Sequence, residues 1–298
     1  MDISESLRIV SQALSILKNE YAFHKSTICL GNAFFTGVSE KEYISMDNKL
    51  KAIRQDFAKI LIIMNSIDRT YLAYKSDKYI SSFFSIIDSQ ATSELGCFIE
   101  YLFAKYRVIL EYIQQILNIC IPPSFNEIQK EEYSKLQKSH KKYKYLLKYI
   151  SENIDKTNSL LNTDWFQNIR IDRDFIIHDG ATCFVFSDKE NLLFKVMTTD
   201  ALDKEEKSEP FFENSEGLKY YVRYWGMHIS KLIVFAETVF EFLIKIGHIN
   251  NENMFLIHSF YSKEKVKIED SDGTELNDVQ DVLIKMLETL MGEIQLKA

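Results

Sequence analysis

The sequence predicts a mainly α-helical protein, and three observations support this fold class. The 298 residues include only 9 glycines and 3 prolines, fewer turn-forming residues than a chain of many short strands would need. Apolar residues recur at spacings of three and four along most of the chain, as they do on one face of a helix. They make up 46% of the sequence, which is enough to bury one large core or two modest ones.

Two helices are expected in an N-terminal helical extension, residues 1–75. Residues 3–24 carry an amphipathic stripe. Ser39 and Glu42 have the spacing of a capping box, in which each side chain binds the other residue's backbone amide. This pattern predicts a second helix that continues through about Met64.

A third helix is expected from about Phe83 to Ile121. It is apolar on nearly all sides, so other helices should surround it at the centre of the core. Pro122 and Pro123 end it, because proline lacks an amide hydrogen and restricts the residue before it. A thin polar stripe runs along this helix: Glu100, Arg107, Glu111, Gln114 and Asn118. Its charged members, Glu100, Arg107 and Glu111, predict buried ion pairs that satisfy the core.

A helix rich in lysine and tyrosine follows. Ser124 and Glu127 form a second capping-box pattern, which predicts its start, and it continues to about Ile150. Its lysines and tyrosines could offer charge and stacking to single-stranded RNA: Lys130, Lys135, Lys138, Lys141, Lys142, Lys144, Lys148, Tyr133, Tyr143, Tyr145 and Tyr149. The favoured alternative is a solvated face with its tyrosines toward the core, because glutamates nearby dilute the positive charge.

The next segment combines a helix with a small β-hairpin. Residues 158–178 form a helical candidate that contains the most distinctive motif of the chain. Two apolar runs, 183–186 and 192–196, flank a polar stretch at 187–191. This pattern is typical of a β-hairpin.

The rest of the chain is expected to be helical again. Residues 200–217 are acidic and polar, which predicts a mobile loop. Long and final helices are expected at 219–246 and 279–294, with short strands at 254–273. Together these features predict one helical domain over 1–298, closed by a C-terminal extension at 251–298.

Composition limits the function classes. A net charge of −7 argues against a strongly basic nucleic-acid clamp, although it allows a local basic patch. The most apolar stretch, Leu232–Ile246, contains three charged residues, so no membrane span is expected. The acidic start lacks a secretory signal, which predicts a cytoplasmic protein. The four cysteines stand alone without metal-site spacing, so neither a metal nor a cofactor is expected.

The chemically distinctive run is Arg173–His178. On an ideal helix, side chains five residues apart point roughly 140° apart and are separated by about 7.5 Å along the axis, so these two should converge only across a cleft. Asp174 lies four residues before His178, on the same face, where its carboxylate could orient the imidazole. The alternative is a structural helix end, at which Arg170 pairs with Asp174 and His178 favours the helix dipole.

Arginine, an acid and histidine within one and a half turns supply the groups that phosphodiester cleavage needs in the absence of metal. Histidine can move protons between the ribose 2′-hydroxyl, the leaving 5′-oxygen and water. A guanidinium can hold the phosphate as its negative charge builds. These are the groups that RNA cleavage by the neighbouring 2′-hydroxyl would use, whereas the spacing alone favours the structural helix end.

Residues 165–180, WFQNIRIDRDFIIHDG, resemble the signature of the HEPN superfamily, which is an arginine, four to six residues and a histidine. The polar residue after the arginine, here Asp174, also fits that signature. The apolar helix at 98–113 looks like the long helix that precedes the motif in these proteins. The resemblance covers about residues 80–250.

The resemblance implies a bundle of four or more helices that pairs as a homodimer, with two motifs facing one cleft. Many HEPN proteins are metal-independent RNases of bacterial toxin–antitoxin or antiviral defence systems. Others are inactive modules that bind nucleotide, RNA or a partner protein. By this resemblance Arg173 and His178 are catalytic, Asp174 supports them, and RNA, a second copy and an antitoxin are the expected partners. In some toxins a tyrosine stands two residues after the histidine, where this chain has Gly180, so regulation by modifying that tyrosine is not expected.

Overall fold

A computed structural model describes residues 2–74, 90–154, 159–162, 164–188, 190–197, 210–249 and 278–297. Within these ranges the predicted mainly α-helical fold is confirmed. The helices in chain order are α1 (Ile3–Asn19), α2 (His24–Gly31), α3 (Glu40–Tyr74), α4 (Gln90–Cys120), η2 (Pro122–Ser124), α5 (Glu127–Lys135), α6 (Ser139–Asn153), η3 (Asp164–Phe166), α7 (Gln167–His178), α8 (Tyr221–Ile246) and α10 (Asp278–Gln295).

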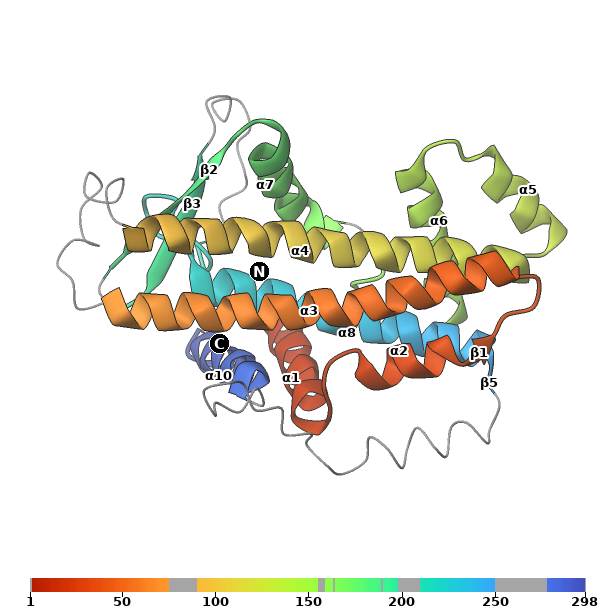
Figure 1. Cartoon of the computed structure of the whole chain (residues 1–298), viewed down its shortest axis with the longest axis horizontal. Coiled ribbons are helices and arrows are strands. Elements are labelled where there is room, and N and C mark those ends of the chain that lie inside the picture. The colour runs from red at the N-terminus through yellow and green to blue at the C-terminus, as the bar shows by residue number, and fades with distance from the viewer. Residues whose placement is uncertain are drawn as a thin grey trace.

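The two longest helices, α3 and α4, lie side by side, and α8 lies behind them (Figure 1). As expected of a helix that others surround, α4 buries apolar side chains along its whole length. The α8 helix is buried even more completely, from Tyr221 to Leu243. One hydrophobic cluster includes residues of all three helices, so they form the centre of the core.

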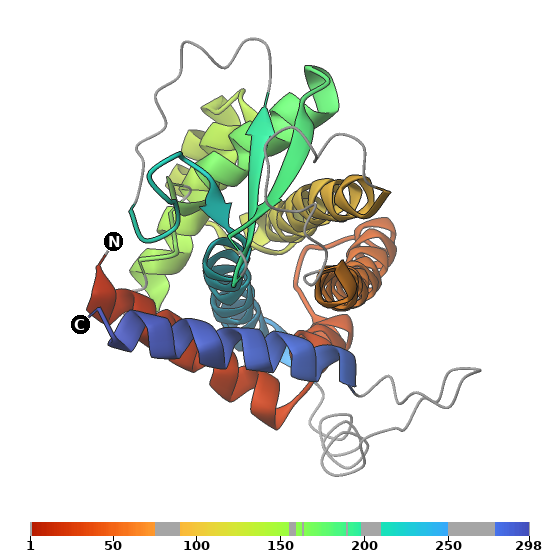
Figure 2. The same ribbon diagram turned by 90° about the vertical axis from the view of Figure 1, so that its left-hand side faces the viewer.

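The first helix is shorter than predicted. Instead of one helix over residues 3–24, α1 ends at Asn19 and α2 begins at His24, after Phe23 has adopted a left-handed backbone with φ 68°. The break lets α1 cross the bundle beside α10, and the two helices run in opposite directions (Figure 2). Leu283 and Leu287 of α10 are fully buried in the same cluster as the core of α1.

One of the two predicted capping boxes is confirmed. Before α3, the Ser39 amide donates to Glu42 Oε2 over 2.8 Å, and the Glu42 amide donates to Ser39 Oγ over 3.4 Å. The second prediction was wrong by two residues. The cap before α5 is Asn126, whose side chain accepts from the Gln129 amide and whose amide donates to the Gln129 side chain.

The predicted lysine- and tyrosine-rich helix is two helices, α5 and α6, separated by residues 136–138. Aromatic packing accounts for the break. Tyr133 of α5 and Tyr145 of α6 both pack against Phe125, with ring centroids 5.5 and 5.7 Å from it. The Tyr145 hydroxyl also donates to Glu132 over 2.9 Å. These contacts fold the two helices back on each other as a hairpin.

The predicted β-hairpin is confirmed as β2 (Thr182–Ser187) paired with β3 (Leu192–Met197). A third strand, β4 (Lys219–Tyr220), pairs with β3, and β1 (Ala33–Phe34) pairs with β5 (His248–Ile249). These two-residue strands are too short to leave a periodic signal in the sequence.

Of the loop predicted at 200–217, the structure describes 210–217. There Phe211 is buried, with the Arg223 guanidinium 5.3 Å from its ring centroid, so this part packs against α8. The strands predicted at 254–273 and the predicted start of the third helix at 83–89 lie outside the described residues. None of the described helices is both long enough and apolar enough to cross a lipid bilayer.

Candidate functional site

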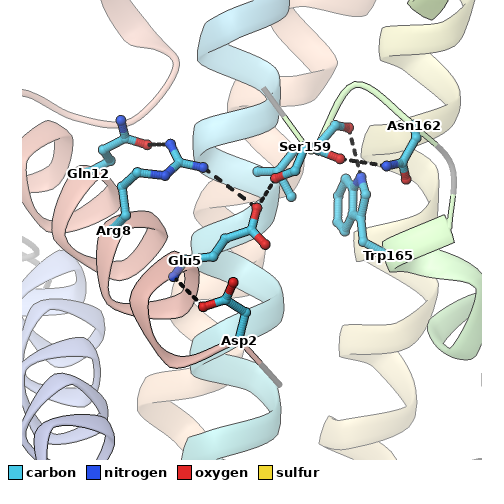
Figure 3. Close-up of polar contacts among 8 residues, drawn as sticks. Asp2, Glu5, Arg8, Gln12, Ser159, Asn162 and Trp165 are labelled. Carbon is cyan, nitrogen blue, oxygen red and sulfur yellow. Dashed lines mark hydrogen bonds and ion pairs between the residues drawn. The ribbon is translucent and has the colours of Figure 1, made fainter. Parts of the chain in front are cut away.

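The motif helix, α7, starts later than the predicted residue 158. A turn precedes it: the Asn162 side-chain amide donates to the Ser159 carbonyl over 2.6 Å, and the Trp165 indole donates to the Leu160 carbonyl over 2.9 Å (Figure 3). The Ser159 hydroxyl also donates to Glu5 of α1. These bonds compete with helical ones, so they delay the helix and connect its start to α1.

One face of α7 packs onto the core through residues three and four apart. Ile169 is buried, Ile176 packs against the core, and Asp172 lies between them and is also buried. The Asp172 carboxylate accepts from Lys219 Nζ over 2.8 Å and from the Tyr224 hydroxyl over 3.1 Å. This buried pair connects α7 to β4 and α8, and so fixes which residues of α7 point outward.

Sequence reasoning assigned no role to Asp172. A signal was available, because its spacing from the two isoleucines places it on the apolar face of the helix. A buried carboxylate needs a partner, but Lys219 is 47 residues away in the chain. Only the fold identifies that partner.

The structure brings the three predicted site residues together at the outer end of α7. Arg173 Nη1 lies 2.9 Å from Asp174 Oδ1 and 3.5 Å from His178 Nε2. His178 is exposed, whereas the Arg173 side chain is only 23% exposed. The histidine therefore faces solvent, with a guanidinium beside its ring.

Two geometric expectations were wrong. Arg173 and His178 approach each other within one chain, because the long arginine side chain extends along the helix toward its C-terminal end, where the histidine lies. Asp174 was expected to orient His178, yet its hydrogen-bonding partner among the described residues is Arg173. Arg170 and Asp174, which were expected to pair if the helix end is structural, are both described and form no ion pair with each other.

The guanidinium keeps a donor, Nε–H, that no described residue uses. Arg173 Nε is buried, and among the described residues it has no hydrogen-bond partner. Both protein contacts of the guanidinium come from Nη1. Because an arginine carries five N–H donors and no acceptor, its contact with His178 is a hydrogen bond only when Nε2 carries no proton. That form of the imidazole is the one that can accept a proton.

The turn after His178 explains why glycine follows the motif. Gly180 has a left-handed backbone with φ 65°, which residues with a side chain rarely adopt. The Phe175 carbonyl accepts from the amides of both Asp179 and Ala181 over 3.1 Å, which ends α7 and starts the path to β2. A tyrosine at position 180 would strain this turn.

The first strand after the motif is held directly on α4. The Cys183 amide donates to Glu100 Oε1 over 2.8 Å, and a Cβ on Gly96 would lie only 2.6 Å from the Cys183 carbonyl oxygen. Glu100 therefore binds a backbone amide, whereas the predicted ion pair on the polar stripe of α4 is formed by Arg107 and Glu111 at 3.1 Å. Together with the Asp172 pair, this contact fixes both ends of the segment that carries the motif.

Comparison of the chain with known protein families, with curated protein sequences and with solved structures found no match. Within the described part of the chain, no three His, Cys, Asp or Glu side chains gather as metal ligands would. The chemistry of the site therefore has to be argued from its residues and their geometry.

Proposed function

We propose that the protein is a metal-independent endoribonuclease and that Arg173 and His178 are its catalytic residues. The observation that carries the proposal is the contact between Arg173 Nη1 and His178 Nε2, 3.5 Å apart at the exposed end of α7. An imidazole, which can accept a proton, and a guanidinium, a group that binds phosphate in many proteins, are thus neighbours at an exposed helix end. The HEPN-like motif spacing supports the same chemistry.

In the proposed reaction, the ribose 2′-oxygen attacks the adjacent phosphorus atom. The new bond joins the 2′-oxygen to phosphorus, and the bond from phosphorus to the 5′-oxygen breaks. As the guanidinium turns to the phosphate, its contact with His178 Nε2 is released, and Nε2 accepts the 2′-hydroxyl proton and then returns a proton to the leaving 5′-oxygen. The products are a 2′,3′-cyclic phosphate and a 5′-hydroxyl, and no redox change takes place.

Arg173 supplies the positive charge. Negative charge builds on the phosphate oxygens as the 2′-oxygen attacks, and a guanidinium can bind two of them through parallel N–H bonds. Asp174 holds one end of that guanidinium through Nη1. Its supporting role is therefore to position Arg173 rather than to orient His178.

We also propose the biological setting that the HEPN resemblance implies. The chain would act in the cytoplasm as a toxin or antiviral effector, with an antitoxin or other partner protein that restrains it. It would work as a homodimer, with the exposed end of α7 from each copy facing a shared cleft.

The reaction is tested by incubating the purified protein with RNA in EDTA and determining the end groups of the products by mass spectrometry. We expect cleavage to 2′,3′-cyclic phosphate and 5′-hydroxyl ends, and no cleavage of the same sequence made with 2′-O-methyl ribose. Arg173→Ala should lower the rate at least about 100-fold. Arg170→Ala, on an exposed position of the same helix, is the matched control and should leave the rate unchanged. Intact RNA, or cleavage only after a divalent metal is added, would contradict the proposal.

A second candidate is a non-catalytic module that binds nucleotide, RNA or a partner protein through the same residues. The salt bridge between Arg173 and Asp174 favours it, because a paired guanidinium is less available to a phosphate in a transition state. Binding of 2′-O-methyl RNA that depends on Arg173, combined with no cleavage of RNA, would identify this module.

A further inference from the structure

The lysines of the α5–α6 hairpin form two groups, according to whether they form an ion pair with a described residue. Three are paired with glutamates: Lys130 with Glu127, Lys135 with Glu131 and Lys148 with Glu152. A further glutamate, Glu132, accepts from the Tyr145 hydroxyl. Four lysines form no ion pair with any described residue: Lys138, Lys141, Lys142 and Lys144.

These four, which we call the unpaired lysines, lie within seven consecutive residues where α6 begins. The sequence alone suggested that neighbouring glutamates dilute the charge of this hairpin. In the fold, those glutamates are bonded to other side chains, so positive charge is concentrated at one end of α6. The first turn of a helix adds a partial positive charge of its own.

A hollow of about 430 Å³ lies beside this end of α6, between the hairpin and α4. It is lined by Asn118, Pro122, Tyr133, Gln137, Ser139 and Lys142. A second hollow of about 250 Å³ shares Asn118 and Ser139 with the first and continues along α4 to the ion pair of Arg107 and Glu111. The two hollows adjoin along α4, and we call them together the track.

Hydrogen bonds shape the walls of this track. The Tyr133 hydroxyl donates to Asn118 Oδ1 over 2.6 Å, and the Gln114 side-chain amide donates to Ser139 Oγ over 2.8 Å. Lys142 Nζ lies 5.2 Å from the centroid of the Tyr133 ring. An aromatic ring and a cation without an acidic partner among the described residues therefore meet at the hollow.

We infer that this track binds single-stranded RNA, with the backbone phosphates at the unpaired lysines and one base in the hollow beside Tyr133. The inference rests on the proposed function, since it assigns the substrate a binding surface away from the motif. Proteins that hold single strands combine a positive groove with aromatic rings, and this track has both.

The test measures binding without cleavage. A fluorescent 2′-O-methyl RNA oligonucleotide, which lacks the attacking hydroxyl, is titrated with the protein and followed by anisotropy at several salt concentrations. The test variant is Lys138→Ala with Lys142→Ala. The control is Lys130→Ala with Lys135→Ala, which removes the same charge from the paired lysines of the same hairpin.

We expect the affinity of the test variant to fall at least about tenfold. The logarithm of the association constant falls linearly with the logarithm of the salt concentration. The magnitude of this slope should be smaller by about 1.4 in the test variant, because each lysine that neutralises a phosphate adds about 0.7 to it. The control should bind like the wild type. No binding by the wild type, or equal reductions in the two variants, would overturn the inference. Because binding is measured on an RNA that cannot be cleaved, the result does not depend on whether the protein is catalytically active. Melting curves of both variants show whether either substitution unfolds the protein.

Discussion

At the residue scale, buried polar side chains connect segments that are far apart in the sequence. Glu237 of α8 lies in the core, where its Oε1 accepts from the Phe23 amide over 3.0 Å and from the Ser26 hydroxyl over 3.2 Å. It thereby binds the start of α2, just where the backbone of Phe23 is left-handed. The Glu237 side chain is charged in its ordinary form, yet the residue is only 9% exposed.

The buried carboxyl predicts a pH-dependent stability. Burial raises the pKa of Glu237 from 4.5 to about 7, and the nearby charges of Glu20 and Glu241 act in the same direction. The folded protein therefore keeps a proton that the unfolded chain releases, and stability should fall as pH rises from about 4.5 to about 7. At about 1.4 kcal/mol per pKa unit, the decrease is at most roughly 3.5 kcal/mol.

Denaturant unfolding of the wild type and Glu237→Gln at pH 5 and pH 8 measures this effect. The amide keeps an oxygen acceptor for Phe23 and Ser26 but does not ionise, so the variant should gain stability relative to the wild type as pH rises. Using the difference between the two proteins removes the contribution of His228, whose pKa burial lowers. A constant difference between the two pH values would show that Glu237 does not titrate on folding.

At the scale of elements, the ends of α7 set the orientation of the motif. The turn before the helix is bonded to α1 through Ser159, and Gly180 ends the helix with a positive φ. A Cβ at position 180 would meet no described atom within 4 Å. Any cost of a substitution there must therefore come from the backbone.

Gly180→Ala is expected to lower the free energy of unfolding by about 1 kcal/mol, because alanine is strained in the left-handed region. The matched control is Gly292→Ala in α10, which also has open space around its Cβ. There alanine favours the helix, so stability should rise by about 0.5–1 kcal/mol. Thermal melts of the two variants should shift in opposite directions, and a shift in the same direction would contradict this account of the turn.

The sequence predicted long elements well and their interruptions poorly. Apolar periodicity and the Ser39 capping box identified α3, α4 and α8, because these signals extend over many residues. The breaks at Phe23 and at residues 136–138 depend on tertiary partners, namely Glu237 and the ring of Phe125. Local propensity cannot reveal partners that the fold supplies.

At the scale of the whole molecule, one hydrophobic cluster connects the first helix to the last. It includes Ile9 of α1 and Ile294 of α10, together with residues of α3, α4 and α8. The segments predicted as extensions thus contribute side chains to the same core as the motif helix. Weaker packing of α10 should destabilise the whole fold.

Leu287→Ala is expected to lower the free energy of unfolding by about 2–4 kcal/mol, because this side chain is fully buried and its removal leaves a cavity. Leu296→Ala is the control, since Leu296 is 90% exposed and its removal should change stability little. Both effects are measured by chemical denaturation. A similar small effect in both variants would mean that α10 does not belong to the core.

The candidate site could be predicted from the sequence only in part. The spacing in the chain placed Arg173, Asp174 and His178 on one helix. It did not predict that Asp174 binds Arg173, since that choice depends on side-chain rotamers and on solvent. The buried partner of Asp172 needed the tertiary structure, whereas the glutamates that pair with Lys130, Lys135 and Lys148 lie only three or four residues from them in the sequence.

The central claim is that His178 carries the proton transfers of RNA cleavage, and the rate of cleavage by His178→Ala tests it most directly. The wild type and the variant are compared on one RNA in EDTA, with His248→Ala, another exposed histidine, as the control. We predict that His178→Ala slows cleavage by about 100- to 10,000-fold, whereas His248→Ala cleaves like the wild type. Equal rates for the wild type and His178→Ala would contradict the claim.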